Sequence, residues 1–408
     1  MKKKLWTKDF SCITVATVLS AIGGEAMNLP VSLLVFDETN STFLSALVMV
    51  CGMLPDVLFS VLVAPLIDKG GKKRWIVGLD ALLAILYAVM GVWVGAHEFV
   101  FGLYLVFTLV VGTISVFYRL AYSSWYPDLI PCGLEQKGYA VSSMLYPVVT
   151  IAMSPVAAFL YEKTEMQNIF FIVTGITVVS VLVESNIREK RKNEKGNYTL
   201  RQYGNDIREE FTYLKKEKGI RNIYMNMSVM QGTSEGMGLI TQVYYQTQPF
   251  LTVTMLGFLI SSEMIGRVFG GLLQYKKEIP VKKRYPFTKF VYLFYSAVDM
   301  IILFLPYPAM LVSRFVCGGL GISSATIREA AVQSYLPEQM RARVNAFFDV
   351  LFAIGGVLFQ FLAGALGQFM PYRAAAVFIG MISIVSILVF IILPDKVNRP
   401  VYEAVRSE

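Results

Sequence analysis

The chain has 408 residues, of which 55% are hydrophobic and only 16% are charged. A soluble domain carries about 25% charged residues, so this composition argues against a soluble enzyme, a disordered chain and a disulfide-rich secreted domain. The formal charge of +8 does not require a nucleic-acid partner, because basic loops on one side of a membrane produce the same excess.

Residues that carry redox, metal and nucleotide chemistry are scarce. Cys12, Cys51, Cys132 and Cys317 form no CxxC pair and lie in or beside apolar runs, and His97 is the single histidine. The sequence contains no glycine motif of the kind that binds ATP phosphates or dinucleotides. We therefore expect no metal site, no cofactor and no enzymatic activity.

Apolar runs follow one another along the whole chain, and each is long enough to cross a bilayer as a helix. The first run could pass for a signal peptide, but it is too long and lacks a small-residue cleavage site, so we interpret it as a retained span. The predicted fold class is an all-α integral membrane protein with twelve transmembrane helices. The spans lie near residues 9–36, 42–67, 75–95, 99–122, 138–161, 168–185, 222–246, 252–275, 286–305, 309–331, 344–367 and 374–393.

Basic residues gather in one set of alternate loops, whereas the opposite loops hold only Lys163 and Arg373. The positive-inside rule then predicts a multi-pass protein of the cell membrane with both termini in the cytoplasm. The long polar segment 186–221 lies on the same side and contains an amphipathic pattern near 199–218. We interpret it as a linker on the inner membrane surface rather than a regulatory site.

The two halves of the chain repeat one another. The segment around Glu25 is similar to the segment around Glu235, and the basic run 72–74 recurs at 282–284, at the same distance along the chain. This repeat predicts two pseudo-symmetric six-helix halves with a cavity between them. The predicted domains are an N-terminal half (1–185), a linker (186–221) and a C-terminal half (222–408).

These features resemble the major facilitator superfamily, and the resemblance covers essentially the whole chain. The run Ala64–Arg74 is similar to the family's loop motif Gly-x-Leu-Ala-Asp-Arg-x-Gly-Arg-Lys/Arg, with Ala64 in place of the first glycine. Ser154 precedes Pro155 where the antiporter motif of the fifth span has glycine, and the fourth span lacks the family's arginine at its expected place. Further segments are similar to the branch of macrolide and siderophore exporters: Gly78–Leu83, Tyr126–Pro131, Ser154–Ala158 and Leu336–Val344.

The resemblance implies a monomeric secondary transporter that works by alternating access, with a small-molecule substrate and protons as the coupling ion. It also implies that Asp68 contacts a helix end of the other half and holds the cytoplasmic side shut, since an anion is favoured at a helix N-terminus. The resemblance further implies that this contact is surrounded by three basic side chains, those of Lys72, Lys73 and Arg74. Asp80, at the start of the next span, belongs to the same motif scaffold.

Charges inside spans mark the candidate functional sites, because a charge at mid-bilayer costs about 3 kcal/mol on insertion scales. Glu25 and Glu235 hold matching places in the first and seventh spans, and we expect them to handle protons or a cationic substrate. The alternative is that neighbouring hydroxyl and amide groups satisfy both carboxyls. Glu263, Asp299 and Arg314 also lie inside spans.

Asp56 and Arg267 hold matching places in the second and eighth spans. They predict either an ion pair between the halves or separate pairs within each half, since a lone buried charge is costly. Arg119 and Arg328 lie near the cytoplasmic ends of their spans, and Asp349 is the expected mate of Arg328. For these residues we expect gating pairs.

The sequence thus predicts proton-coupled export of an amphipathic or hydrophobic small molecule, such as a drug or natural product. One alternative is uptake or exchange of a polar or anionic nutrient, which arginines without acidic mates in the cavity would favour. A second alternative is a transporter-like lipid-handling or sensor protein, which a groove open to the bilayer would favour.

Overall fold

The computed structural model describes residues 4–68, 71–131, 133–188, 216–276 and 279–404. The predicted amphipathic helix of the linker lies outside these residues. In the first part of the chain the helices are α1 (Lys8–Thr39), α2 (Thr42–Asp68), α3 (Lys72–Ala96), α4 (Phe101–Leu129), α5 (Glu135–Lys163) and α6 (Met166–Ser185). They are followed by α8 (Lys218–Thr247), α9 (Val253–Lys276), α10 (Val281–Ile301), α11 (Tyr307–Tyr335), α12 (Glu338–Phe369), α13 (Tyr372–Ser386) and α14 (Asp395–Tyr402).

Eleven helices of the described chain are long and apolar enough to cross a membrane. The helix α8, 30 residues long, stands where the seventh span was predicted but is too polar to be counted with them. Its polarity comes from side chains such as Asn226, Gln231, Glu235 and Gln242, of which Asn226 and Gln242 are buried within the protein. A polar helix is compatible with a membrane when its polar side chains face protein rather than lipid. The predicted all-α membrane fold is confirmed.

The described residues fall into two compact units. Unit 1 is drawn from Met1–Asn40, Cys51–Tyr198 and Leu251–Ser261, and unit 2 from Ser41–Val50, Thr199–Phe250 and Ser262–Glu408. The predicted boundaries of the two halves and the linker, at residues 185 and 221, stay a prediction.

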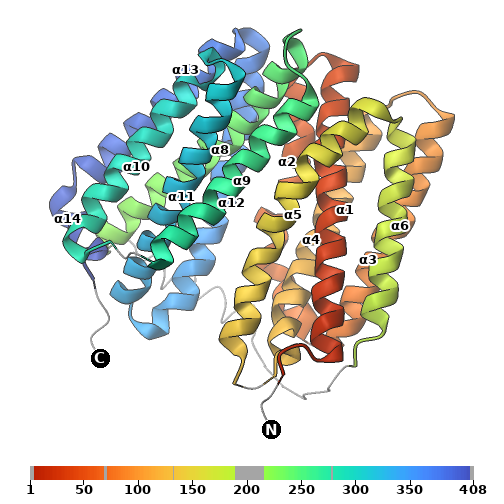
Figure 1. Ribbon diagram of the computed structural model, residues 1–408, viewed down its shortest axis with the longest axis horizontal. Helices are drawn as coiled ribbons and strands as arrows, with labels where there is room; N and C mark the ends of the chain where they lie inside the picture. Colours follow the sequence, from red (N-terminus) through yellow and green to blue (C-terminus); the bar gives the residue numbers. More distant parts are fainter. Residues whose placement is uncertain (1–3, 69–70, 132, 189–215, 277–278, 405–408) are drawn as a thin grey trace. The chain divides into compact units, whose positions relative to one another are not determined.

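Both units use the same packing scheme. In unit 1, α6 packs against α1 and α3, and α1 also packs against α5 (Figure 1). In unit 2, α13 packs against α8 and α10, and α8 also packs against α12. The helices therefore correspond in order, with α1 matching α8 and α6 matching α13, as the internal sequence repeat predicts.

The helix α3 shows how a lipid environment determines which side chains face outward. Its apolar residues Leu82, Ile85, Val89 and Val92 are among the exposed large side chains, whereas the carboxyl residue Asp80 is buried. A helix of a soluble protein has the opposite pattern, with an apolar face on the core. The exposed apolar face of α3 is suited to lipid chains, and the polar residue faces the interior of unit 1.

Glycines allow the helices of unit 1 to approach closely. A Cβ atom added to Gly112 of α4 would lie 2.3 Å from the carbonyl oxygen of Gly52 in α2. Small residues at such crossings let two backbones pack directly in a membrane. A Cβ added to Gly102, on the same helix, would meet nothing within 4 Å.

We expect Gly112→Ala to destabilise the protein by about 1–3 kcal/mol, because the new methyl group would overpack the crossing of α2 and α4. The matched control Gly102→Ala should leave stability unchanged or slightly higher, since alanine favours helix. Thermal unfolding of the two purified variants in one detergent measures the difference. Equal melting temperatures would contradict the assigned crossing.

Candidate functional site

A cavity of about 500 Å³ lies within unit 1. Carboxyl side chains from α1, α2 and α3 line it, together with one arginine and several tyrosines of α3, α4 and α5. The combination of charged groups with aromatic rings suits a ligand that is partly apolar and partly charged. The principal lining residues are Ser20, Glu25, Asn28, Asp56, Asp80, Tyr87, Tyr118, Arg119, Tyr122 and Tyr146.

Glu25 projects into this cavity from α1. Gly24, beside it, also lines the cavity, and a Cβ added there would meet nothing within 4 Å, so the helix is open on this side. The hydroxyl of Thr150 in α5 donates to Glu25 Oε1 at 2.9 Å. No lysine or arginine of the described chain forms an ion pair with Glu25, so its carboxyl is available to a proton or a cationic ligand.

Arg119 of α4 forms an ion pair with Asp56 of α2 at the wall of the same cavity. Both side chains are partly exposed, 57% for Arg119 and 42% for Asp56, so the pair lies at an open part of the cavity. Arg267, which the sequence matched with Asp56, instead bonds Glu263 in its own helix at 2.9 Å. The structure thus gives each of the two charges a partner in its own unit.

Asp80 lies in the cavity wall. Its buried carboxylate accepts a hydrogen bond from Ser20 of α1 at 3.1 Å, and Ser20 in turn contacts the hydroxyl of Ser180 in α6 at 3.2 Å. The predicted role of Asp80 in the loop scaffold stays a prediction. The structure adds these contacts to α1 and α6, because Asp80 lies two helical turns into α3, beyond the basic residues that begin the helix.

Sequence reasoning missed Glu184 of α6. Its side chain is fully buried, and Tyr118 of α4 donates to Glu184 Oε1 at 3.0 Å. The residue stands one position before the end of its helix, where an acidic side chain usually belongs to a solvated loop. The sequence feature that could have identified Glu184 is its spacing of four residues from Ser180, because this spacing places both polar side chains on one helix face.

The basic residues of the loop motif tie α3 to the ends of other helices. Lys72 Nζ donates to the carbonyl of Ser124 at 2.7 Å and pairs with Asp128 at 3.2 Å. Lys73 Nζ donates to the carbonyl of Ser185, the last residue of α6, at 2.7 Å. A cation is favoured at a helix C-terminus. Arg74 is exposed, and the side chain of Asp68 lies outside the described residues, so its predicted contact stays a prediction.

The motif Ser154-Pro155 of α5 forms a close helix contact. A Cβ added to Gly257 of α9 would lie 2.5 Å from Pro155 Cα and 2.7 Å from the carbonyl oxygen of Ser154. Ser261, one turn further along α9, donates to the carbonyl of Ile151 at 2.7 Å. The motif therefore lies at a crossing of α5 and α9, where its backbone rather than its side chains makes the closest approach.

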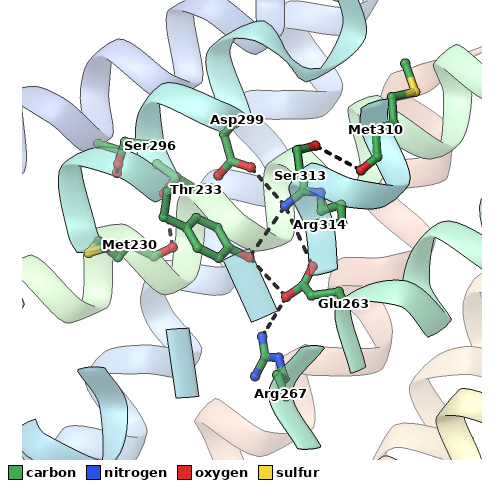
Figure 2. Close-up of polar contacts among 11 residues, drawn as sticks. Met230, Thr233, Glu263, Arg267, Ser296, Asp299, Met310, Ser313 and Arg314 are labelled. Atoms are coloured by element: carbon green, nitrogen blue, oxygen red, sulfur yellow. Dashed lines mark hydrogen bonds and ion pairs between the residues drawn. The ribbon is translucent and has the colours of Figure 1, made fainter. Parts of the chain in front are cut away.

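Unit 2 contains a buried network of ion pairs around Arg314 of α11. Its guanidinium lies 3.0 Å from the carboxylate of Asp299 and 3.7 Å from that of Glu263. Figure 2 shows Arg314 between these two carboxylates, with Glu263 also bonded to Arg267. The phenol of Tyr295 donates to Glu263 at 3.1 Å. Two arginines and two carboxylates thus neutralise one another, which suits a low-dielectric interior.

The remaining predicted residues of unit 2 lie apart from that network. Glu235 Oε1 accepts a hydrogen bond from Gln231 at 2.9 Å within α8. Arg328 and Asp349 line one cavity of about 400 Å³, together with the stacked rings of Tyr224 and Phe348. The Arg328 guanidinium contacts the sulfur of Met227 at 2.7 Å. The structure therefore places Arg328 and Asp349 at one site.

Comparison with known proteins decides the family. A sequence model described as the Major Facilitator Superfamily matches residues 13–305 and 284–407. The chain belongs to the major facilitator superfamily. It is therefore a multi-pass membrane transporter of a small molecule rather than an enzyme.

Similarity to individual proteins is low in sequence and high in fold. Macrolide efflux protein A of Streptococcus pyogenes is 22% identical over 67% of this chain and 69% of its own length. A protein of the same name from Enterococcus faecalis is 23% identical over 56% of this chain and 72% of its own length. The transporter thus resembles the macrolide-efflux branch of the family.

Solved structures agree on the fold. The nucleoside transporter NupG superposes with a TM-score of 0.71 at 12% identity, covering 93% of this chain and 98% of its own. A bacterial homologue of the human lysosomal transporter spinster gives 0.69 at 13% identity, covering 98% of both chains. At such identities the likeness extends to the fold alone.

We expect Arg314→Met to destabilise unit 2 by about 3–5 kcal/mol, because it leaves Asp299 without its cation and removes one partner of Glu263. The double variant Asp299→Asn with Arg314→Met should recover part of that loss. Arg399→Gln, which breaks an exposed pair with Asp395, should cost about 0–1 kcal/mol. Thermal unfolding in detergent compares them, and an equal loss for R314M and R399Q would contradict a buried network.

Proposed function

We propose that this transporter exports an amphipathic or hydrophobic small molecule across the cell membrane in exchange for protons. The observation that carries the proposal is the cavity of unit 1, in which the carboxyl of Glu25 has a hydroxyl partner and no basic partner among the described residues. The rings of Tyr118, Tyr122 and Tyr146 supply apolar contact surface in the same cavity. The likeness to macrolide efflux proteins supports export and a large, partly apolar substrate.

In this proposal Glu25 binds either a proton or the positive part of the substrate. A carboxyl that can hold only one of the two at a time couples their movement in opposite directions. Glu235, its counterpart in the internal repeat, is the second candidate for this role, with Gln231 as its hydrogen-bond partner. In this proposal the exchange depends on these carboxyls and not on the antiporter motif, from which the chain departs at Ser154.

The pairing of Arg119 argues against an anionic nutrient as the ligand of the unit 1 cavity. An anion would need an arginine with unsatisfied hydrogen-bonding capacity in the cavity. Arg119, the arginine of this cavity, is instead paired with Asp56. The remaining charge of the cavity is acidic, which favours a neutral or cationic substrate.

The orientation completes the proposal. Both termini and the linker lie in the cytoplasm, by the positive-inside rule, and the protein acts as a monomer. Export then means that substrate enters the cavity from the cytoplasmic side and protons enter from outside.

We expect Glu25→Gln to lower proton-driven transport at least tenfold, because the amide keeps the size of the side chain but binds no proton. Accumulation of a radiolabelled macrolide in everted membrane vesicles with an imposed pH gradient measures this activity. The matched control Glu98→Gln, on an exposed residue between α3 and α4, should transport like the unmodified protein. Glu235→Gln is measured in parallel.

A second assay separates coupling from binding. Glu25→Gln vesicles loaded with unlabelled substrate should still exchange it for labelled substrate without a gradient, because this exchange needs no proton. Full gradient-driven accumulation by both glutamate variants would refute the proposal. Accumulation of an anionic probe by the unmodified protein, with none of the macrolide, would favour the nutrient alternative.

A further inference from the structure

Asp80 and Glu184 form a second pair of carboxyl groups in unit 1, separate from Glu25. Asp80 is 2% exposed and Glu184 is 0% exposed, so neither carboxyl is solvated at the protein surface. They lie on α3 and α6, which pack directly against each other, and Ser20 joins Asp80 to Ser180, one helical turn before Glu184 on α6. Asp80 lines the cavity of unit 1, whereas Glu184 lies behind Tyr118.

The hydrogen bonds distinguish the two groups. Asp80 Oδ2 accepts from Ser20, whose hydroxyl also contacts Ser180. Glu184 Oε1 accepts from the phenol of Tyr118. The second oxygen, Glu184 Oε2, is buried and has no hydrogen-bond partner within the described part of the chain. A buried carboxylate oxygen without a donor is costly, whereas the hydroxyl of a neutral carboxyl is less so.

No basic side chain of the described helices compensates this pair. Around it, α3 contributes the phenol of Tyr87, α4 those of Tyr118 and Tyr122, and α5 that of Tyr146. On α1, Glu25 adds a further acidic group to the same cavity. Two cations of α3 and α4 are engaged elsewhere, Arg119 with Asp56 and Lys73 with the carbonyl of Ser185.

Two ionised carboxylates buried on neighbouring helices, away from water and without a cation, are strongly disfavoured, and such pairs hold a proton. We propose that Asp80 and Glu184 together bind one proton, so that the pair carries a single negative charge. The proton resides on Oε2 of Glu184, while Asp80 stays ionised and accepts from Ser20. Exchange with the cavity runs through Asp80 and Tyr118, which both line it. This site is independent of the role proposed for Glu25.

Infrared titration of the purified protein tests this site directly, because a protonated carboxyl has a carbonyl stretch that a carboxylate lacks. Between mildly acidic and mildly alkaline pH, the unmodified protein should release about one proton from this pair as a unit. Glu184→Gln should abolish that band, since the amide keeps the acceptor for Tyr118 but carries no acidic proton. Asp80→Asn should move the midpoint of the titration, and Glu98→Gln should not.

Each of the other outcomes overturns the proposal. A band that persists in E184Q and disappears in Glu25→Gln would assign the proton to Glu25. Loss of the band when sodium replaces potassium would make the pair a metal-cation site. If E184Q fails to fold by circular dichroism, Glu184→Asp replaces it, and an unchanged band position in that variant refutes the assignment. The titration needs no substrate or gradient, so its result is independent of whether transport is proton-coupled.

Discussion

The architecture of this transporter depends on one constraint, which is that a charge inside a low-dielectric interior must be paired, neutralised or given access to water. Beyond Arg74 in its first turn, the exposed side chains of α3 are apolar, and its single acidic residue faces the interior of unit 1. The interior of each unit is consequently where the polar chemistry collects. Packing supports this arrangement, because glycines such as Gly112 bring backbones together without occupying the space that polar side chains need.

The two units meet the constraint in different ways. In unit 2, Arg314 and Arg267 balance Asp299 and Glu263 within one connected network. Such a network holds α9, α10 and α11 in fixed register and has no net charge to exchange. In the cavity of unit 1, Arg119 pairs with Asp56, and the other carboxyls of the described cavity lining form no ion pair.

The sequence was informative where a single residue carries the signal. Glu25 could be identified as an intramembrane charge in an apolar run, and the structure places it in the cavity of unit 1. The helical fold and the likeness to the family followed from apolar periodicity and the loop motif, and the family match confirms both. The span α8 was predicted as one of the successive apolar runs, although it is more polar than the other spans.

The pairing of charges could not be predicted from the sequence, because it depends on how helices rotate about their axes. Asp56 matches Arg267 by position, yet contacts Arg119. Asp80 was assigned to the loop by its motif, which did not predict its hydrogen bond with Ser20. Glu184 was missed because it stands at the end of a helix, where a side chain that points back toward the N-terminus reaches the interior although its backbone is near the surface.

This difference between the units determines where exchangeable charge can be stored. A neutral network such as that around Arg314 resists protonation, because adding a proton to one carboxylate frees a buried arginine that then lacks its partner. Protonation of a buried carboxyl group that has no cationic partner frees no arginine. Binding of a proton or a cationic ligand therefore lowers the free energy of the buried group. Glu25 faces the cavity and can meet both, whereas Glu184 is fully buried behind Tyr118 and is accessible to a proton alone. Burial therefore distinguishes Glu25, which can select a ligand, from Glu184, which can only neutralise charge.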